Sequence, residues 1–239
     1  MQKKIETLSK EFFKDKKIEI DKNSFYKEFY LSLSEIKSFS TNLYNFIIIQ
    51  PEITIEIIEN VLSELLWVDN IRIRFVDYDK EIKETKIRDI RAKDIGKIVS
   101  ITGYCISASD VRPQIIRARF ECEECGTIIV VNQTEKVFKE PTSCSCGNKN
   151  NLKFKSQELA DFQRIIIAEN NAEYEKNNSP KISVFLSEGL TDPERKVFEN
   201  IGKRVSVIGI LREVRVDVGM GKISTRLDLV IEANNYLFV

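Results

Sequence analysis

Histidine is absent from this 239-residue sequence, and no run of eighteen or more apolar residues occurs. Without histidine, Ser-His-Asp and Cys-His catalysis are excluded, and the commonest nitrogen ligand for metals is missing. Without a long apolar run there is no candidate membrane span, and the charged, amphipathic N-terminus does not resemble a secretory signal. We therefore expect a soluble, cytoplasmic protein with no membrane partner.

A net charge is also lacking, because 37 lysines and arginines balance 37 aspartates and glutamates. No global positive field would draw the chain onto DNA or an acidic membrane, so any contact with nucleic acid must come from a local basic cluster. A phosphate-binding loop is missing too. Around the VGMGK segment at 218–222, Val216 and Ile223 stand where G-x-x-x-x-G-K-[ST] requires Gly and Ser or Thr. We expect no ATP site and no enzyme activity from this chain on its own.

Helical periodicity dominates the first part of the sequence. Apolar residues between 54 and 67 recur at i, i+3, i+4 and i+7, directly after Pro51. Residues 24–39 and 43–49 show looser helical spacing, with Asn23-Ser24 as an N-cap. These patterns predict a small helical bundle over residues 1 to about 70, followed by a strand at 71–76 that alternates apolar and polar residues.

Strands dominate from residue 97 onward. Segments rich in Ile and Val predict strands at 97–107, 114–120, 162–168, 181–186, 204–216 and 224–232. Five or six such strands suit a small closed barrel. The polar, Asn-rich segment 169–180 predicts an exposed loop, and the capping-box pattern Thr191-Asp-Pro-Glu194 predicts a short helix from Asp192 to about Ile201.

Four of the five cysteines form two close pairs, Cys122-x-x-Cys125 and Cys144-x-Cys146, eighteen residues apart. This spacing is typical of a zinc ribbon, in which two short knuckles place four thiolates around one Zn²⁺. Two disulfides or four unrelated core cysteines are the alternatives. A four-thiolate site leaves no open position for water, so the metal, one Zn²⁺ per chain, would be structural. The fifth cysteine, Cys105, is expected to be a buried core residue.

Two groups of basic residues are candidates for binding nucleic acid. Gly219 and Gly221 predict a long β-hairpin between residues 204 and 232, with Lys222 at its tip and Arg215 and Arg226 beside it. The alternative is a hairpin whose charged residues only keep an exposed sheet edge in contact with solvent.

The second group, Arg112, Arg117 and Arg119, precedes the first cysteine pair. Arg117 and Arg119 share one face of a strand, where a barrel would present a groove for single-stranded nucleic acid. A solvated strand face is the alternative, because glutamates follow at once.

The run from Ile87 to Gly126, IRDIRAKDIGKIVSITGYCISASDVRPQIIRARFECEECG, resembles the signature stretch of the N-terminal domains of archaeal minichromosome maintenance (MCM) replicative helicases. The stretches ADFQRIIIAE and GILREVRV…RLDLVIEANNYLFV are similar to later strands of that family. The resemblance implies an α+β fold, with a helical subdomain at 1–90, an OB-fold β-barrel at 91–120 and 154–239, and an inserted zinc ribbon at 121–153.

The resemblance also implies a hexamer or double hexamer that binds single- and double-stranded DNA in its channel, associated with the nucleoid. Arg215, Lys222 and Arg226 would then belong to a channel hairpin, while Arg112, Arg117 and Lys181 would lie near a single-strand-binding surface. The sequence departs from the family pattern in the short Cys144-x-Cys146 knuckle, in Ala168 where Gln is usual, and in Lys181 where the family has Arg.

Two hypotheses of different classes follow from the sequence. The first is the DNA-binding and ring-forming part of a helicase whose ATPase domain lies outside these residues. The second is a monomeric zinc-ribbon adaptor that binds other proteins and has no affinity for DNA.

Overall fold

The computed structural model describes residues 1–14, 16, 26–133, 138–170, 179–217 and 223–239. By their contacts these residues form two units. The main unit comprises residues 1–109 and 164–239, and the smaller unit comprises residues 110–163. None of the described helices has the length and apolar content that crossing a membrane requires.

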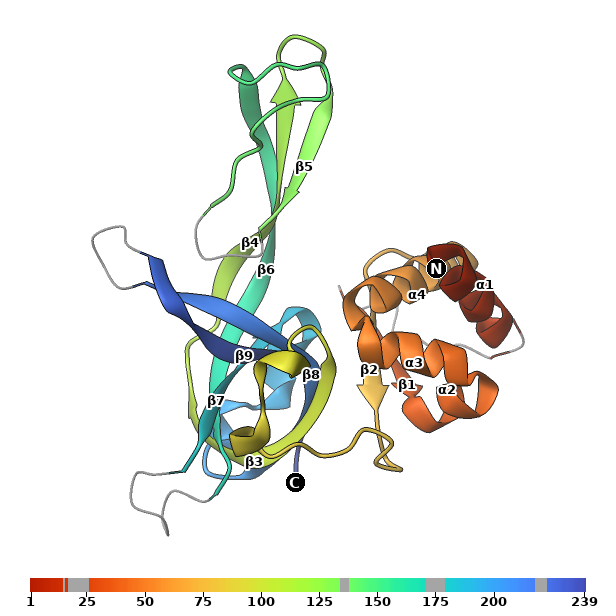
Figure 1. Ribbon diagram of the computed structural model, residues 1–239, viewed down its shortest axis with the longest axis vertical. Helices are drawn as coiled ribbons and strands as arrows, with labels where there is room; N and C mark the ends of the chain where they lie inside the picture. The colour runs from red at the N-terminus through yellow and green to blue at the C-terminus, as the bar shows by residue number, and fades with distance from the viewer. Residues whose placement is uncertain (15, 17–25, 134–137, 171–178, 218–222) are drawn as a thin grey trace. The chain divides into compact units, whose positions relative to one another are not determined.

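Helices gather at the N-terminal end of the main unit, coloured red to orange in Figure 1. They are α1 (Gln2–Phe13), α2 (Leu33–Phe39), α3 (Thr41–Ile49) and α4 (Pro51–Leu66). Ser40 caps α3 by accepting a hydrogen bond from the backbone amide of Leu43, and Pro51 opens α4, where a missing amide hydrogen costs nothing. The predicted helix at 54–67 is thereby confirmed.

A parallel pair of strands, β1 (Lys27–Ser32) and β2 (Ile71–Val76), lies against these helices. The prediction of a helix over residues 24–39 was therefore wrong for residues 27–32, and the predicted N-cap Asn23-Ser24 lies outside the described residues. Phe29 and Leu31 are two residues apart, which is the period of a strand, and they pair with Ile73 and Phe75 of β2. Inter-strand pairing satisfies the backbone there, and it overrides the weak local helical pattern.

A closed ring of strands forms the rest of the main unit. Strands β3, β8, β9, β7 and β6 follow one another in the sheet, and β6 pairs again with β3. Their bounds are β3 (Ile98–Ala108), β6 (Leu152–Ala168), β7 (Lys181–Ser187), β8 (Arg204–Asp217) and β9 (Ile223–Phe238). This closure is that of an OB-type barrel, as predicted.

The barrel interior is filled by every second residue of its strands, including Ile101, Ile167, Val184 and Val207. Cys105 is fully buried among them, as predicted. Ile98 and Ile208 point the other way and join the core of the helical segment. The parts of β3 and β8 that carry Ile98 and Ile208 are therefore covered on both faces, which explains the adjacent apolar pairs Ile98-Val99 and Val207-Ile208.

Short 3₁₀ turns replace the helix predicted from Asp192 to Ile201. The turns in the barrel are η1 (Ile87–Asp89), η2 (Ala92–Asp94), η3 (Glu188–Thr191), η4 (Pro193–Arg195) and η5 (Phe198–Asn200). The Thr191 hydroxyl donates to the Glu188 carbonyl, and the Asp192 carboxylate accepts from the Glu194 amide. Lys196 has a φ of 50°, so the left-handed backbone there ends the helical run.

The smaller unit is a three-stranded antiparallel sheet made of β4 (Arg112–Cys122), β5 (Ile128–Asn132) and the first part of β6. Its apolar contacts centre on Phe120, which is buried and meets the rings of Phe138 and Phe154. The predicted domain boundaries stay a prediction.

A glycine in β8 offers a test of the barrel packing. A Cβ added to Gly209 would lie 2.4 Å from the Glu232 carbonyl oxygen and 2.6 Å from Ile231 Cγ2. Because the first contact is with the backbone of β9, we expect Gly209→Ala to lower the free energy of unfolding by about 3 kcal/mol, at the upper end for overpacking. Urea unfolding followed by circular dichroism measures this. Ser206→Ala on the same strand is the control and should change it by less than about 1 kcal/mol.

Candidate metal centre and nucleic-acid surface

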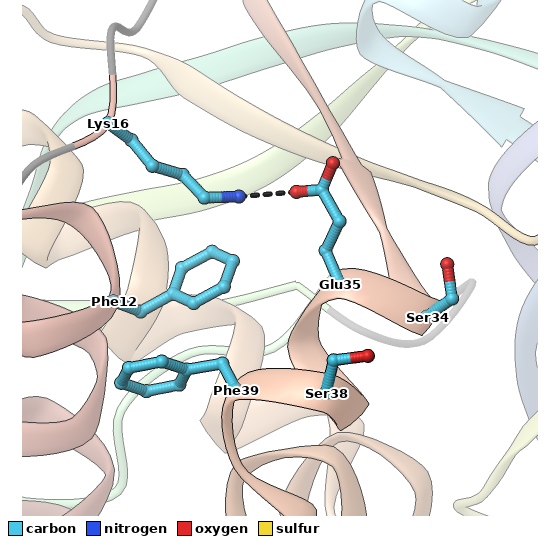
Figure 2. A pocket seen from close by; sticks show the side chains of 6 residues that line it. All are labelled: Phe12, Lys16, Ser34, Glu35, Ser38 and Phe39. Carbon is cyan, nitrogen blue, oxygen red and sulfur yellow. Dashed lines mark hydrogen bonds and ion pairs between the residues drawn. The ribbon is translucent and has the colours of Figure 1, made fainter.

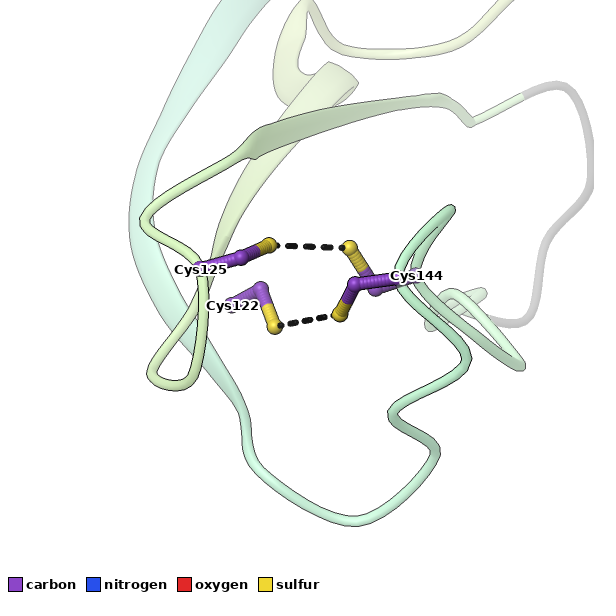
Figure 3. A group of neighbouring side chains, drawn as sticks. Cys122, Cys125 and Cys144 are labelled. Carbon is purple, nitrogen blue, oxygen red and sulfur yellow. Dashed lines mark hydrogen bonds between the residues drawn. The ribbon is translucent and has the colours of Figure 1, made fainter.

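The four paired cysteines come together within the smaller unit, and Figure 3 labels three of them, Cys122, Cys125 and Cys144. Their sulfurs lie within 4.8 Å of one another, with Cys122 Sγ 3.7 Å from Cys146 Sγ and Cys125 Sγ 3.5 Å from Cys144 Sγ. Sulfurs held tetrahedrally around Zn²⁺ at about 2.3 Å are about 3.8 Å apart. The cluster therefore has the size of a four-thiolate metal site.

Two tight turns position these sulfurs. The amide of Gly126 donates to the Cys122 carbonyl at 2.8 Å, and the amide of Gly147 donates to the Cys144 carbonyl at 2.9 Å. Gly126 and Gly147 have φ values of 70° and 93°, which residues with a Cβ rarely adopt. The small residues expected after each cysteine pair are thus required by the backbone.

Asn148 supports the centre, and sequence reasoning did not identify it. Its side-chain amide donates to Cys122 Sγ at 3.3 Å, and its side-chain oxygen accepts from the amides of Asn150 and Asn151. The hydrogen bond to the sulfur is the main cause that lowers the pKa of Cys122 to about 6. Asn148 therefore favours the thiolate form that binds metals.

The pKa of Cys146 shows the effect of placing several thiol groups close together. The amide of Asn148 favours the thiolate of Cys146, but the sulfurs of Cys125 and Cys144 raise the pKa of Cys146 to about 12. Four thiolates this close repel one another unless a cation lies among them. A divalent ion would compensate that charge, so the donor set fits Zn²⁺.

The basic residues predicted to bind DNA fall into both units. Arg112, Arg117 and Arg119 belong to the smaller unit, whereas Lys181, Arg215 and Arg226 belong to the main one. Arg112 and Lys181 are exposed, each as the first residue of its strand, β4 and β7.

Arg117 and Arg119 lie on one face of β4, as predicted, and both form ion pairs with Glu158 of β6. One carboxylate shared by two guanidinium groups leaves this face with a positive excess. A phosphate could bind there in competition with Glu158.

The β8–β9 pair is a long antiparallel hairpin, as predicted, with Arg215 opposite Leu227 and Asp217 opposite Ile223. Arg226 on β9 is exposed. Lys222, with Gly219 and Gly221, lies outside the described residues.

The predicted loop 169–180 begins and ends close together. The Glu169 amide donates to the Pro180 carbonyl, and the Asn170 amide donates to Ser179 Oγ, both at 3.0 Å. The Glu169 carboxylate binds the guanidinium and the amide of Arg88 in η1. The base of the loop is thus anchored beside a fully buried Ala168.

A shallow hollow between α1 and α2 does not bring together a set of candidate functional groups as the cysteine cluster does. Its volume is about 520 Å³, and Phe12 and Phe39 supply its apolar wall. Lys16 and Glu35 pair with each other across it, as Figure 2 shows. We assign no function to it.

Comparison with known proteins agrees with these features. A family model of the MCM OB domain matches residues 86–215, more than half of the chain. The minichromosome maintenance protein MCM of Saccharolobus solfataricus is 26% identical over 203 residues, which cover 77% of this chain and 28% of that protein. The DNA replication licensing factor mcm6 of Schizosaccharomyces pombe is 37% identical over 102 residues, which cover 40% of this chain and 11% of that protein.

A crystal structure of the N-terminal domain of an archaeal MCM has the same fold. It matches with a TM-score of 0.78 and 25% identity, and the match covers 100% of both chains. In contrast, this chain spans less than a third of the length of each of the two curated relatives from Saccharolobus solfataricus and Schizosaccharomyces pombe. With a matching family model, an OB-type barrel and a four-cysteine cluster, the chain belongs to the MCM family of replicative helicases, and it has the fold of the family's N-terminal domain.

Proposed function

We propose that this chain is the DNA-binding and ring-assembly part of a replicative helicase. It would hold single- and double-stranded DNA through phosphate contacts, without sequence preference, in a ring of six copies or two such rings. The observation that carries this proposal is the MCM OB domain with exposed cations on its strands. Unwinding would belong to an ATPase domain of the same protein or complex.

We assign the DNA contacts to Arg112, Arg117, Arg119 and Lys181, together with the hairpin residues Arg215, Lys222 and Arg226. Lys181 contributes a point charge rather than the two-pronged guanidinium of Arg, which suits phosphate contact better than planar recognition. We assign one structural Zn²⁺ per chain to Cys122, Cys125, Cys144 and Cys146.

Phosphate contacts predict a steep dependence of DNA binding on salt, because each contact releases a condensed counterion. Reversing Lys222→Glu together with Arg226→Glu should weaken binding at least about tenfold and flatten its salt dependence. Fluorescence anisotropy with a labelled single strand and a duplex measures both. Lys3→Glu with Lys4→Glu is the control, since it changes the charge equally on the exposed first turn of α1, where acidic residues are tolerated. If the hairpin variant bound DNA with unchanged affinity, the hairpin would be excluded as a DNA contact.

Native mass spectrometry distinguishes this function from the zinc-ribbon adaptor. Six- or twelve-chain assemblies that carry one zinc per chain and take up DNA would support the ring. A zinc-loaded monomer that ignores DNA, even at high protein concentration, would favour the adaptor.

A further inference from the structure

A second hollow of the main unit lies where residues 82–86 and the turns η1 and η2 meet the start of β3. Its volume is about 540 Å³, and four lysines line it: Lys83, Lys86, Lys93 and Lys97. We call it the lysine hollow. Its lining lies within residues 82–99, none of which is among the DNA-binding residues named above.

The lysine hollow is a local basic cluster in a chain without net charge. Residues 83–97 contain six lysines and arginines against three aspartates and glutamates. Arg88 pairs with Glu169, and the Arg91 guanidinium donates to the carbonyls of Arg88 and Ile90. The four lysines have no ion pair with any residue that the structure describes. Their charges are therefore available to a ligand.

Three carboxylates also line the hollow, and they limit what it can bind. The Asp94 carboxylate accepts a hydrogen bond from the Arg91 amide at 3.1 Å, whereas Glu84 and Asp89 are exposed. Four cations against three anions leave a small positive excess. A phosphodiester carries one negative charge and matches this excess, whereas pyrophosphate or a nucleoside triphosphate carries more negative charge than the excess can neutralise.

The backbone that carries the lysines is fixed on both sides. The Thr85 amide donates to the Ser100 carbonyl at 2.8 Å, which ties residues 82–86 to β3. The Leu211 amide donates to the Lys97 carbonyl at 3.0 Å, which ties the start of β3 to β8. Ile98 and Val99 beneath are buried. A ligand here would meet a nearly preformed backbone and would order only the lysine side chains.

We propose that the lysine hollow binds a backbone phosphodiester of nucleic acid. It would supply a contact additional to those assigned above, and this inference rests on the proposed DNA-binding function. Lysine ammonium groups bind phosphate as point charges, so the contact carries no sequence preference.

Replacing the three exposed lysines, as Lys83→Gln, Lys86→Gln and Lys93→Gln together, tests the proposal. We expect about tenfold weaker binding of a single-stranded oligonucleotide at low salt. The slope of log affinity against log salt should fall by about one to two, because one or two phosphate contacts are lost. A control variant with Lys3→Gln, Lys4→Gln and Lys14→Gln changes the net charge equally on α1 and should bind like the wild type.

Three further results separate the possible readings. Arginine at the same three positions keeps the charge and should keep the binding, which shows that the loss is not due to misfolding. If the glutamine variant and the control had equal DNA affinity and equal salt dependence, the lysine hollow would not be a DNA contact, and the proposed function would be unaffected. If the wild type had no affinity for DNA, both the proposed function and the role of the lysine hollow would be overturned. A glutamine variant that keeps the DNA affinity of the control but loses the binding of millimolar pyrophosphate seen with the wild type would identify a free phosphate as the ligand and overturn the phosphodiester.

Discussion

Removing zinc should unfold the unit at residues 110–163 while the barrel and the helices of the main unit stay folded. The smaller unit has little apolar core beyond Phe120 and its neighbours, with Phe138 and Phe154 still 41% and 45% exposed. A core of that size does not offset the entropy of ordering the chain. Zinc binding to small domains contributes on the order of 10 kcal/mol near neutral pH, so the fold of this unit should depend on it.

Hydrogen exchange measured by mass spectrometry, with and without a strong chelator, tests this expectation. Amides of β4 and of the Cys144–Asn148 turn should lose protection, while those of β3 and β8 keep it. Cys144→Ser should have the same effect and should reduce the zinc content of the purified chain. Cys105→Ala is the matched control, because this cysteine lies in the barrel core and not in the cluster.

Treatment with a reductant distinguishes a zinc site from two disulfides. The five cysteines are free in the structure, and sulfur distances of 3.5 and 3.7 Å exceed the bonded distance of about 2.05 Å. If a reductant without chelating power exposed these amides and the chelator did not, the zinc assignment would be wrong and disulfides would take its place.

The four-cysteine cluster could be predicted from the sequence because its determinants are local. Two cysteines separated by one or two residues and followed by a glycine predict a zinc knuckle wherever they occur in a sequence. Asn148 was missed because an asparagine has many structural roles, and only its distance to Cys122 Sγ reveals this one. The lysine hollow was missed for a similar reason, since its lysines are spread among acidic residues and converge only when η1, η2 and β3 are in place.

The strands of the barrel were also predicted, because runs of β-branched residues indicate strands directly, but β6 begins at Leu152, ten residues before its predicted start, and β5 was not predicted. Strand β1 was not, because its partner β2 lies about forty residues away and no local pattern indicates that pairing. The polar contacts between this strand pair and the barrel were equally invisible. Asn234 of β9 accepts from the Phe75 amide at 2.6 Å and donates to the Ile73 carbonyl at 2.7 Å, so one side chain occupies the edge of β2 as a neighbouring strand would.

An acidic cluster at the same junction makes the stability of the main unit depend on pH. Arg72 of β2 pairs with Glu188 of η3 and, at 3.3 Å, with Glu59 of α4. Glu59 also accepts the Ile73 amide at 3.0 Å. Burial, with a smaller effect from the charge of Glu188, outweighs the attraction of Arg72 and Arg74 and raises the pKa of Glu59 from 4.5 to about 7. Two carboxylates thus share one guanidinium, and Glu59 is the one that takes up a proton.

The sign of the pH effect follows from proton uptake. Between pH 4.5 and about 7 the folded chain binds a proton at Glu59 that the unfolded chain has released, so stability falls as pH rises through this range. The difference between 4.5 and about 7 corresponds to about 3 kcal/mol at pH 8. Glu59→Gln keeps an acceptor for the Ile73 amide and removes the charge. We therefore expect the variant to match the wild type near pH 5 and to exceed its stability by up to about 3 kcal/mol at pH 8.

Urea unfolding of both proteins at pH 5, 6.5 and 8, followed by circular dichroism, measures this difference. Fluorescence of the single tryptophan is a poor probe, because Trp67 is already 93% exposed in the folded chain. Glu56→Gln, on the exposed face of the same helix, is the control and should show no difference that changes with pH. A Glu59→Gln variant that is less stable than the wild type at pH 8 would mean that attraction to Arg72 outweighs the cost of burial. The carboxylate would then hold α4 to β2 as an anion, and stability would be lost as pH falls instead.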